Sequence, residues 1–111
     1  MAISEADFEA ANRRMAERLE RETRAVAAHY DAGRGRIVIE LSTDADISFR
    51  PDRLEGLAGA APADLAEIEI SPAGLALHFP RLDADFALAP LLAGIFGSRK
   101  WMAARRYKLK P

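Results

Sequence analysis

The chain has 111 residues, of which 50% are hydrophobic, and it contains no cysteine. This length is typical of one domain, and the absence of thiols excludes disulfides, cysteine nucleophiles and cysteine-based metal centres. No apolar run approaches the roughly 20 residues of a membrane span, and the acidic N-terminus lacks the apolar core of a secretory signal. We therefore expect one soluble, cytoplasmic domain that does not contact a membrane.

Charge is unevenly distributed along the chain, although the total is only -1. Residues 1–24 carry a net charge of -1, residues 25–96 carry -6, and residues 97–111 carry +6 with no acidic residue among them. Such polarity bears on partners rather than on the fold. The basic C-terminal segment must satisfy its charge on this body, on another protein or on a nucleic acid.

Residues 1–23 form the first unit that the sequence predicts, an amphipathic helix beginning near Glu5. Ser4 and Asp7 resemble a capping box, and no glycine or proline interrupts the segment. Its apolar residues recur at spacings of 3, 4 and 4, and they are Phe8, Ala11, Met15 and Leu19. This narrow stripe is suited either to packing on the domain's own sheet or to pairing with a second copy of the helix.

Residues 24–97 are predicted to form an α+β core domain. Period-two alternation predicts an antiparallel meander of three strands, broken by a turn at 31–35 and ended by Pro51. A second hairpin turns at Pro72 to Gly74, after two short helical turns between 51 and 67. A helix over 90–96 that stops at Gly97 completes this unit. The side chains expected to point inward from the meander are Val26, Ile37, Ile39, Ile47 and Phe49.

Histidine and aspartate supply the few candidates for catalysis or metal binding. His29 and His78 are the only histidines and lack metal-ligand spacing, so we expect no metal and no cofactor. Asp83 and Asp85 follow a proline-terminated strand, where capping of backbone amides is the favoured interpretation. We expect no enzymatic activity; a cluster of Asp83, Asp85 and His78 is the weakest alternative.

Residues 98–111 form the third unit, a basic C-terminal helix or tail that Ser98 can cap. Trp101 and Tyr107 lie among cations, a combination that suits stacking on bases while the cations meet phosphates. Docking of Trp101 and Met102 on the core, or a passive solubilising tail, are the other interpretations. The residues of the nucleic-acid alternative are Arg99, Lys100, Arg105, Arg106, Lys108 and Lys110.

Several stretches, in order and spacing, resemble the bacterial domain of unknown function family 2442 over residues 24–102. They include Gly-Arg-Ile-Val-Ile at 35–39, Phe-Arg-Pro at 49–51, Ile-Ser-Pro-Ala-Gly-Leu at 70–75, Leu-His-Phe-Pro-Arg-Leu-Asp at 77–83, and Phe-Gly-Ser-Arg-Lys-Trp-Met at 96–102. The resemblance implies a small α+β fold with a three-stranded meander and a second hairpin. It also implies an association with toxin–antitoxin gene pairs, and it supplies no catalytic residues.

These observations favour a non-enzymatic protein-interaction module with an antitoxin-like, adaptor or regulatory role. Its partner would be a protein, such as a toxin encoded by a neighbouring gene, and the N-terminal helix could also form a homodimer. The alternative is a nucleic-acid-binding accessory protein or transcriptional regulator that uses the basic segment. Large apolar side chains dominate interface energies, so the anchors predicted for a protein partner are Phe8, Met15, Leu19, Trp101 and Tyr107.

Overall fold

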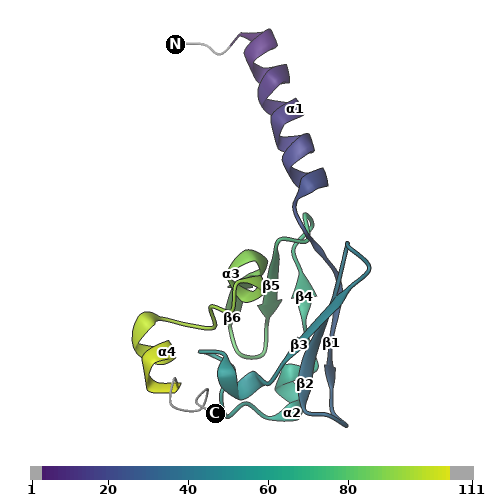
Figure 1. The fold of residues 1–111 in the computed structure, drawn as a ribbon. Helices are drawn as coiled ribbons and strands as arrows, with labels where there is room; N and C mark the ends of the chain where they lie inside the picture. The colour runs from purple at the N-terminus through teal and green to yellow at the C-terminus, as the bar shows by residue number, and fades with distance from the viewer. Residues whose placement is uncertain (1–3, 106–111) are drawn as a thin grey trace.

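The structure, a computed structural model, describes residues 4–105, apart from the side chains of residues 15–21 (Figure 1). A long helix leads into two small antiparallel sheets, each of three strands, with short helical segments between and after them. In chain order the elements are α1 (Glu5–Arg21), β1 (Ala25–Asp31), β2 (Arg36–Leu41), β3 (Asp46–Phe49), the 3-10 turn η1 (Pro51–Arg53), α2 (Pro62–Leu65), β4 (Glu69–Ile70), β5 (Ala76–Phe79), β6 (Ala84–Ala87), α3 (Leu88–Leu92) and α4 (Arg99–Arg105). The predicted α+β class is confirmed.

The first sheet has the order β1-β2-β3 and is the predicted meander. Ile37 and Ile39 are fully buried, and Phe49 is also buried, as the alternation predicts. The prediction that Val26 points inward is wrong, because Val26 is 62% exposed. A register shift between Ala25 and Ala27 makes a β-bulge, and the extra residue reverses the alternation, so Ala25 is buried instead.

The second sheet has the order β4-β5-β6. Its first two strands form the hairpin predicted around Pro72 to Gly74, and β6 adds a third strand to it. Asp83, with φ of 48°, lies in the tight turn between β5 and β6. Because β6 returns along β5, Phe86 reaches Phe79 in an edge-to-face contact, with ring centroids 5.8 Å apart.

One apolar core is shared by the two sheets and the segments between them. Leu54, Leu57 and Leu65, from the helical turns that follow the meander, are buried against strand residues such as Ile37 and Phe79. No polar or charged side chain among the described residues is buried. The body is therefore held by one continuous cluster, as expected for a domain of this size.

The helix predicted over 90–96 lies earlier, at Leu88–Leu92. Pro90 is in its first turn, where backbone N–H groups have no partner within the helix, so the ring is tolerated there. Gly94, with φ of 80°, follows the helix in the left-handed conformation that ends many helices. The chain then continues without regular secondary structure to Gly97, where the prediction placed the end of the helix.

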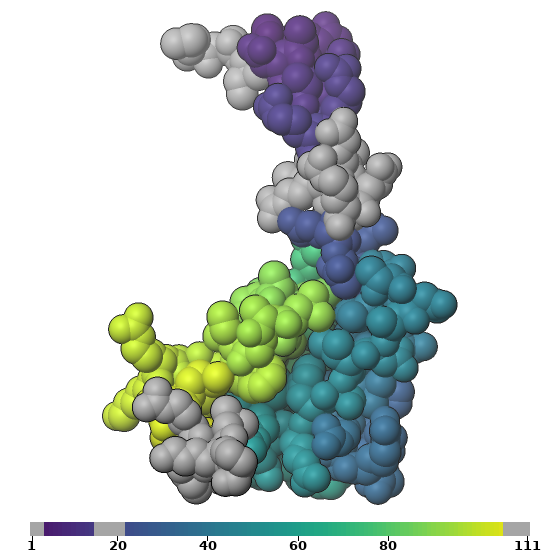
Figure 2. Space-filling model, in the orientation of Figure 1, coloured from purple at the N-terminus to yellow at the C-terminus, as the bar shows by residue number. Residues whose placement is uncertain are grey.

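α1 projects from the body, which gives the molecule extents of 53 × 27 × 27 Å. Figures 1 and 2 show the helix standing above the two sheets, joined to them by a thin connection. Among the residues that the structure describes, α1 is not in extensive contact with any other element. The fold thus presents one helix to solvent, and no described helix is long and apolar enough to cross a membrane.

Candidate interaction surfaces

α1 begins where the sequence predicts and presents an apolar side chain to solvent. The backbone N–H of Asp7 donates to Ser4 Oγ at 3.1 Å, which caps the first turn. Phe8 is 60% exposed in the next turn, although phenylalanine is usually an interior residue. The side chains of the predicted anchors Met15 and Leu19 lie outside the described residues. Their positions on α1 follow Phe8 at helical spacing.

The root of α1 is bonded to two turns of the body. The Arg24 N–H donates to Ser42 Oγ at 2.9 Å, and the Arg24 carbonyl accepts from the Ser42 N–H at 2.8 Å. The Ala25 N–H donates to the Gly74 carbonyl at 2.7 Å, which ties the first sheet to the hairpin of the second. The chain is therefore anchored within three residues of the last residue of the helix, Arg21.

An open apolar depression of about 390 Å³ lies beside this root. The second sheet and α3 supply its apolar lining, and Leu92 is 42% exposed there. Its full lining is Glu22, Thr23, Leu75, Ala87, Ala89 and Leu92. Sequence reasoning missed this surface because it joins residues from three separate parts of the chain.

α4 lies against the body, and this contact places the predicted anchor Trp101 on the domain itself. Trp101 is half-buried, and its indole N–H donates to the Arg53 carbonyl at 2.9 Å. The Arg105 guanidinium lies over the indole, 3.5 Å from the ring centroid, and Nε of Arg105 donates to the Asp52 carbonyl at 3.2 Å. Cation–π stacking and two hydrogen bonds thus hold the helix on the η1 turn.

The segment before α4 is held to the turn after η1. Ser98 caps α4, accepting from the Trp101 N–H at 3.1 Å, as its position in the sequence predicts. Glu55 accepts a hydrogen bond from the Ser98 N–H at 2.8 Å and donates its own backbone N–H to the Phe96 carbonyl at 2.9 Å. A Cβ on Gly97 would lie 2.6 Å from Trp101 Cδ1, so glycine permits this close approach.

These contacts bear on the nucleic-acid alternative. The Arg105 guanidinium stacks on the Trp101 ring, and both side chains donate N–H groups to backbone carbonyls of the domain. This pair is therefore not an open platform on which a base could stack. Arg99 and Lys100 are exposed. The remaining residues predicted for this surface lie outside the described part of the chain, and they are Arg106, Tyr107, Lys108 and Lys110.

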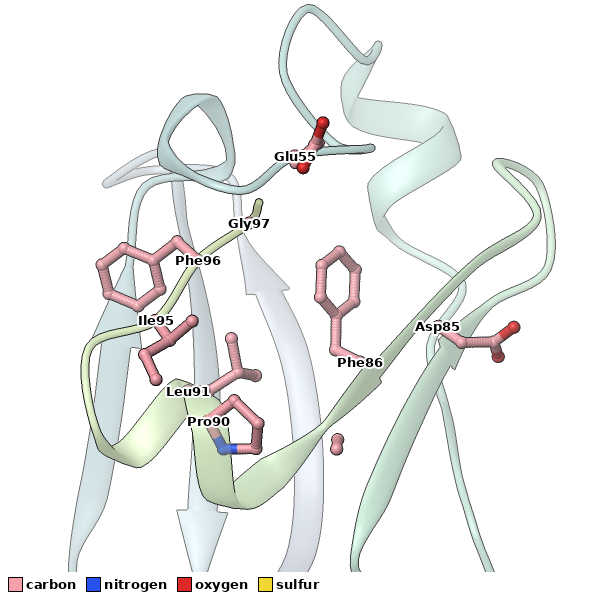
Figure 3. A pocket seen from close by; sticks show the side chains of 9 residues that line it. Glu55, Asp85, Phe86, Pro90, Leu91, Ile95, Phe96 and Gly97 are labelled. Carbon is pink, nitrogen blue, oxygen red and sulfur yellow. The ribbon is translucent and has the colours of Figure 1, made fainter. Parts of the chain in front are cut away.

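A shallow groove of about 330 Å³ separates β6 from the segment that joins α3 to α4 (Figure 3). Phe86 lies on one side of the groove and Ile95 and Phe96 on the other, with Pro90 and Leu91 at one end. Ile95 is 53% exposed, whereas the Phe96 ring lies 6.0 Å from Phe49, centroid to centroid. The groove is an open apolar surface rather than an enclosed site.

Of the candidate acid–base residues, only His78 and Asp85 are shown in direct contact with each other. His78 and Asp85 face each other across β5 and β6, with Nδ1 and Oδ1 2.6 Å apart. The Asp85 side chain is 74% exposed and that of His78 is 35% exposed, so solvent surrounds the pair. Asp83 lies in the adjoining turn, and His29 is exposed on the other sheet. In the described part of the chain no group of three or more acidic or histidine side chains could hold a metal ion.

Asp31 carries the one resolved electrostatic perturbation among the described groups. A hydrogen bond from the Arg34 side chain at 2.8 Å, together with one from the Arg34 backbone N–H, lowers the pKa of Asp31 below its usual 3.8. Asp31 is the last residue of β1 and Arg34 lies in the turn before β2, so this interaction stabilises the turn in which the chain reverses direction. The lowered pKa of Asp31 therefore reflects the structure of this turn and does not indicate a catalytic role.

Comparison with known proteins places the fold in a family. A family model described as a protein of unknown function (DUF2442) matches residues 25–97. The crystal structure of a protein of unknown function from Rhodospirillum rubrum is 40% identical, with a TM-score of 0.70, and the match covers 73% of this chain and 98% of that one. The solution NMR structure of an uncharacterized protein from Chromobacterium violaceum is 41% identical, with a TM-score of 0.70 and coverage of 95% of this chain and 96% of that one.

A search of curated proteins found no match. The family model covers the two sheets and α3 and leaves α1 and α4 outside the matched range. Both solved relatives share the fold at about two-fifths sequence identity. Since about two thirds of its residues match the family model, the chain belongs to the DUF2442 family of proteins of unknown function.

Proposed function

We propose that this protein is a non-enzymatic protein-interaction module in which α1 is the binding element. The observation that carries the proposal is Phe8, a large apolar side chain that is 60% exposed on a helix projecting from the body. Aromatic side chains on exposed surfaces are characteristic anchors of protein interfaces. The family body would then serve as the scaffold that holds this helix.

The physical chemistry of the helix supports the proposal. α1 has 17 residues, only slightly more than the roughly 12–15 residues below which an isolated helix is marginal in water, and most helical stability in proteins comes from packing an apolar face. The Ser4 cap and the hydrogen bonds at Arg24 and Ala25 define both ends of the segment, yet no described element covers the helix between them. A protein that buries Phe8 would supply the missing packing.

The specific form that we propose is an antitoxin-like or adaptor role in the cytoplasm. An antitoxin masks its toxin through an interface with an apolar centre and a polar rim. α1 offers that arrangement, because Phe8 lies among charged neighbours such as Asp7 and Glu9. The product of a neighbouring gene is therefore the first partner to test.

The test is co-expression of the full chain, carrying an affinity tag, with the product of the neighbouring gene. Phe8→Glu should reduce the amount of retained partner at least tenfold, because a charge replaces the apolar anchor. Ala6→Glu is the matched control: it adds the same charge two residues earlier, about half a helical turn away and so on the face opposite Phe8, and should retain the partner. Equal retention by both variants, or no retention by the wild-type chain, would count against this function.

A further inference from the structure

We propose that α1 pairs with α1 of a second copy of this chain in antiparallel orientation, and that the partner's N-terminal residues occupy the depression beside Thr23. This inference rests on the proposed function and names a partner for the same helix. It draws on three features of the chain: the division of charge along α1, the spacing of its apolar positions, and the depression at its root.

Charge divides α1 into an acidic half and a basic half. Residues 5–12 contain three acidic residues and no basic one, and they are Glu5, Asp7 and Glu9. Residues 13–21 contain four arginines against two glutamates. Parallel pairing would set like halves together, whereas antiparallel pairing sets each acidic half against the partner's basic half. Complementarity of this kind selects orientation as well as partner.

Apolar spacing along α1 suits the same arrangement. Phe8 lies near the first end of the helix and position 19 near the other, with positions 11 and 15 between them on one face. Full antiparallel overlap sets Phe8 opposite the partner's position 19, and positions 11 and 15 opposite each other near the dyad. The stripe is therefore complementary to itself when it is reversed.

The depression at the root lies where this overlap ends. At 1.5 Å per residue, α1 is about 25 Å long. A fully overlapped partner helix would begin beside Arg21, so its Ser4 would lie near Glu22 and Thr23, which line the depression. The partner's Met1 and Ile3 would then meet an apolar lining that includes Leu75 and the half-exposed Leu92.

The size of the contact sets its expected strength. Two helices with one narrow apolar stripe bury less than the roughly 1,600 Å² of a standard interface. The two depressions, each of about 390 Å³, extend that contact at both ends of the pair. We therefore expect a dimer with micromolar affinity that dissociates on dilution.

Sedimentation of the full chain over a concentration series tests the pairing. The wild-type chain should pass from monomer to dimer, Phe8→Glu should remain monomeric at every concentration, and Ala6→Glu should behave as wild type. A wild-type chain that remains monomeric at millimolar concentration, or dimerisation that is insensitive to Phe8→Glu, would overturn the inference.

Engineered disulfides test the orientation, since the natural chain has no cysteine. Two single-cysteine variants, Ile3→Cys and Ala89→Cys, are oxidised each alone and as an equimolar mixture of the reduced proteins, and covalent dimers are measured on non-reducing gels. Antiparallel pairing predicts a covalent dimer that is strongly enriched in the mixture. In the control mixture the Ala89→Cys variant is exchanged for a Ser48→Cys variant, which carries its cysteine at an exposed site on the first sheet. This mixture should show no enrichment of the covalent dimer.

Efficient cross-linking of Ile3→Cys alone would indicate parallel pairing and overturn the inference. No enrichment in the mixture would overturn the placement of the N-terminal residues. Either failure would leave the proposed function to be judged separately, because retention of the neighbouring gene product does not depend on self-association.

Discussion

α1 and α4 both lie outside the residues that the family model matches, yet they relate to the body in opposite ways. Both helices begin with a serine whose hydroxyl accepts an N–H hydrogen bond at 3.1 Å. α4 is then attached through Trp101 and Arg105 to the carbonyls of η1, whereas the described face of α1 remains in solvent. Similar local signals therefore produce one docked helix and one presented helix, and the difference lies in long-range contacts.

The two attachments also differ in kind. α4 is attached by side chains to backbone carbonyls, through groups about 50 residues away in the sequence. Within the described part of the chain, α1 is joined to the body at its root, through backbone groups of Arg24 and Ala25. Substitutions that remove a contact of α4 or of the root should therefore lower the free energy of unfolding of the whole domain. Substitutions along α1 should not.

The largest expected effect is at the root. Gly74 has φ of 76°, and a Cβ there would lie 2.7 Å from the Ala25 carbonyl oxygen. Gly74→Ala should reduce the free energy of unfolding by about 3 kcal/mol, because it combines left-handed strain with overlap against a backbone atom that cannot rotate away. Chemical denaturation followed by circular dichroism measures the loss.

Gly59→Ala is the matched control, since Gly59 has φ of 80° and no atom within 4 Å of the added Cβ. It should cost only the strain, about 1 kcal/mol. Equal losses from the two alanine variants would show that the close approach of Gly74 to Ala25 does not constrain the root.

Trp101→Ala should have the next largest effect. It removes a half-buried ring, the hydrogen bond to the Arg53 carbonyl and the surface on which Arg105 stacks. We expect a loss of about 2 kcal/mol, below the range for a fully buried tryptophan. Trp101→Phe keeps an aromatic ring but not the N–H donor and should lose about 1 kcal/mol. A Trp101→Ala variant as stable as the wild type would indicate that α4 is not docked in solution.

Local features of the fold were predictable from sequence, and long-range features were not. The caps at Ser4 and Ser98 and the turn at Gly74 follow from residues within three or four positions of one another. The exposure of Val26 depends on how β1 pairs with β2, and alternation along one strand cannot reveal a bulge.

The candidate surfaces divide in the same way. Phe8 was identified from the apolar stripe, because helical spacing alone places it on one face. The sequence left two roles open for Trp101, docking or recognition, and the partner that distinguishes them is the Arg53 carbonyl, 48 residues away. The position of a glycine was also insufficient to predict where α3 ends, because two glycines follow the helix in the sequence. Gly94 follows the end of the helix, whereas Gly97 permits the close approach of Trp101 and Glu55.

The smallest expected effect is that of removing the N-terminal cap of each helix. This pair of substitutions compares α1 and α4 most directly. Ser98→Ala should lower the free energy of unfolding of the whole domain by about 1 kcal/mol, because α4 is docked and its fraying exposes the contacts of Trp101. Ser4→Ala removes a cap of the same geometry, yet it should leave the unfolding midpoint of the body unchanged and reduce only the helical signal of α1. Denaturation followed by the fluorescence of Trp101, the one tryptophan, reports on the body, and far-ultraviolet circular dichroism adds the signal of α1. If Ser4→Ala also shifted the fluorescence midpoint under monomeric conditions, α1 would be coupled to the body and not simply presented by it.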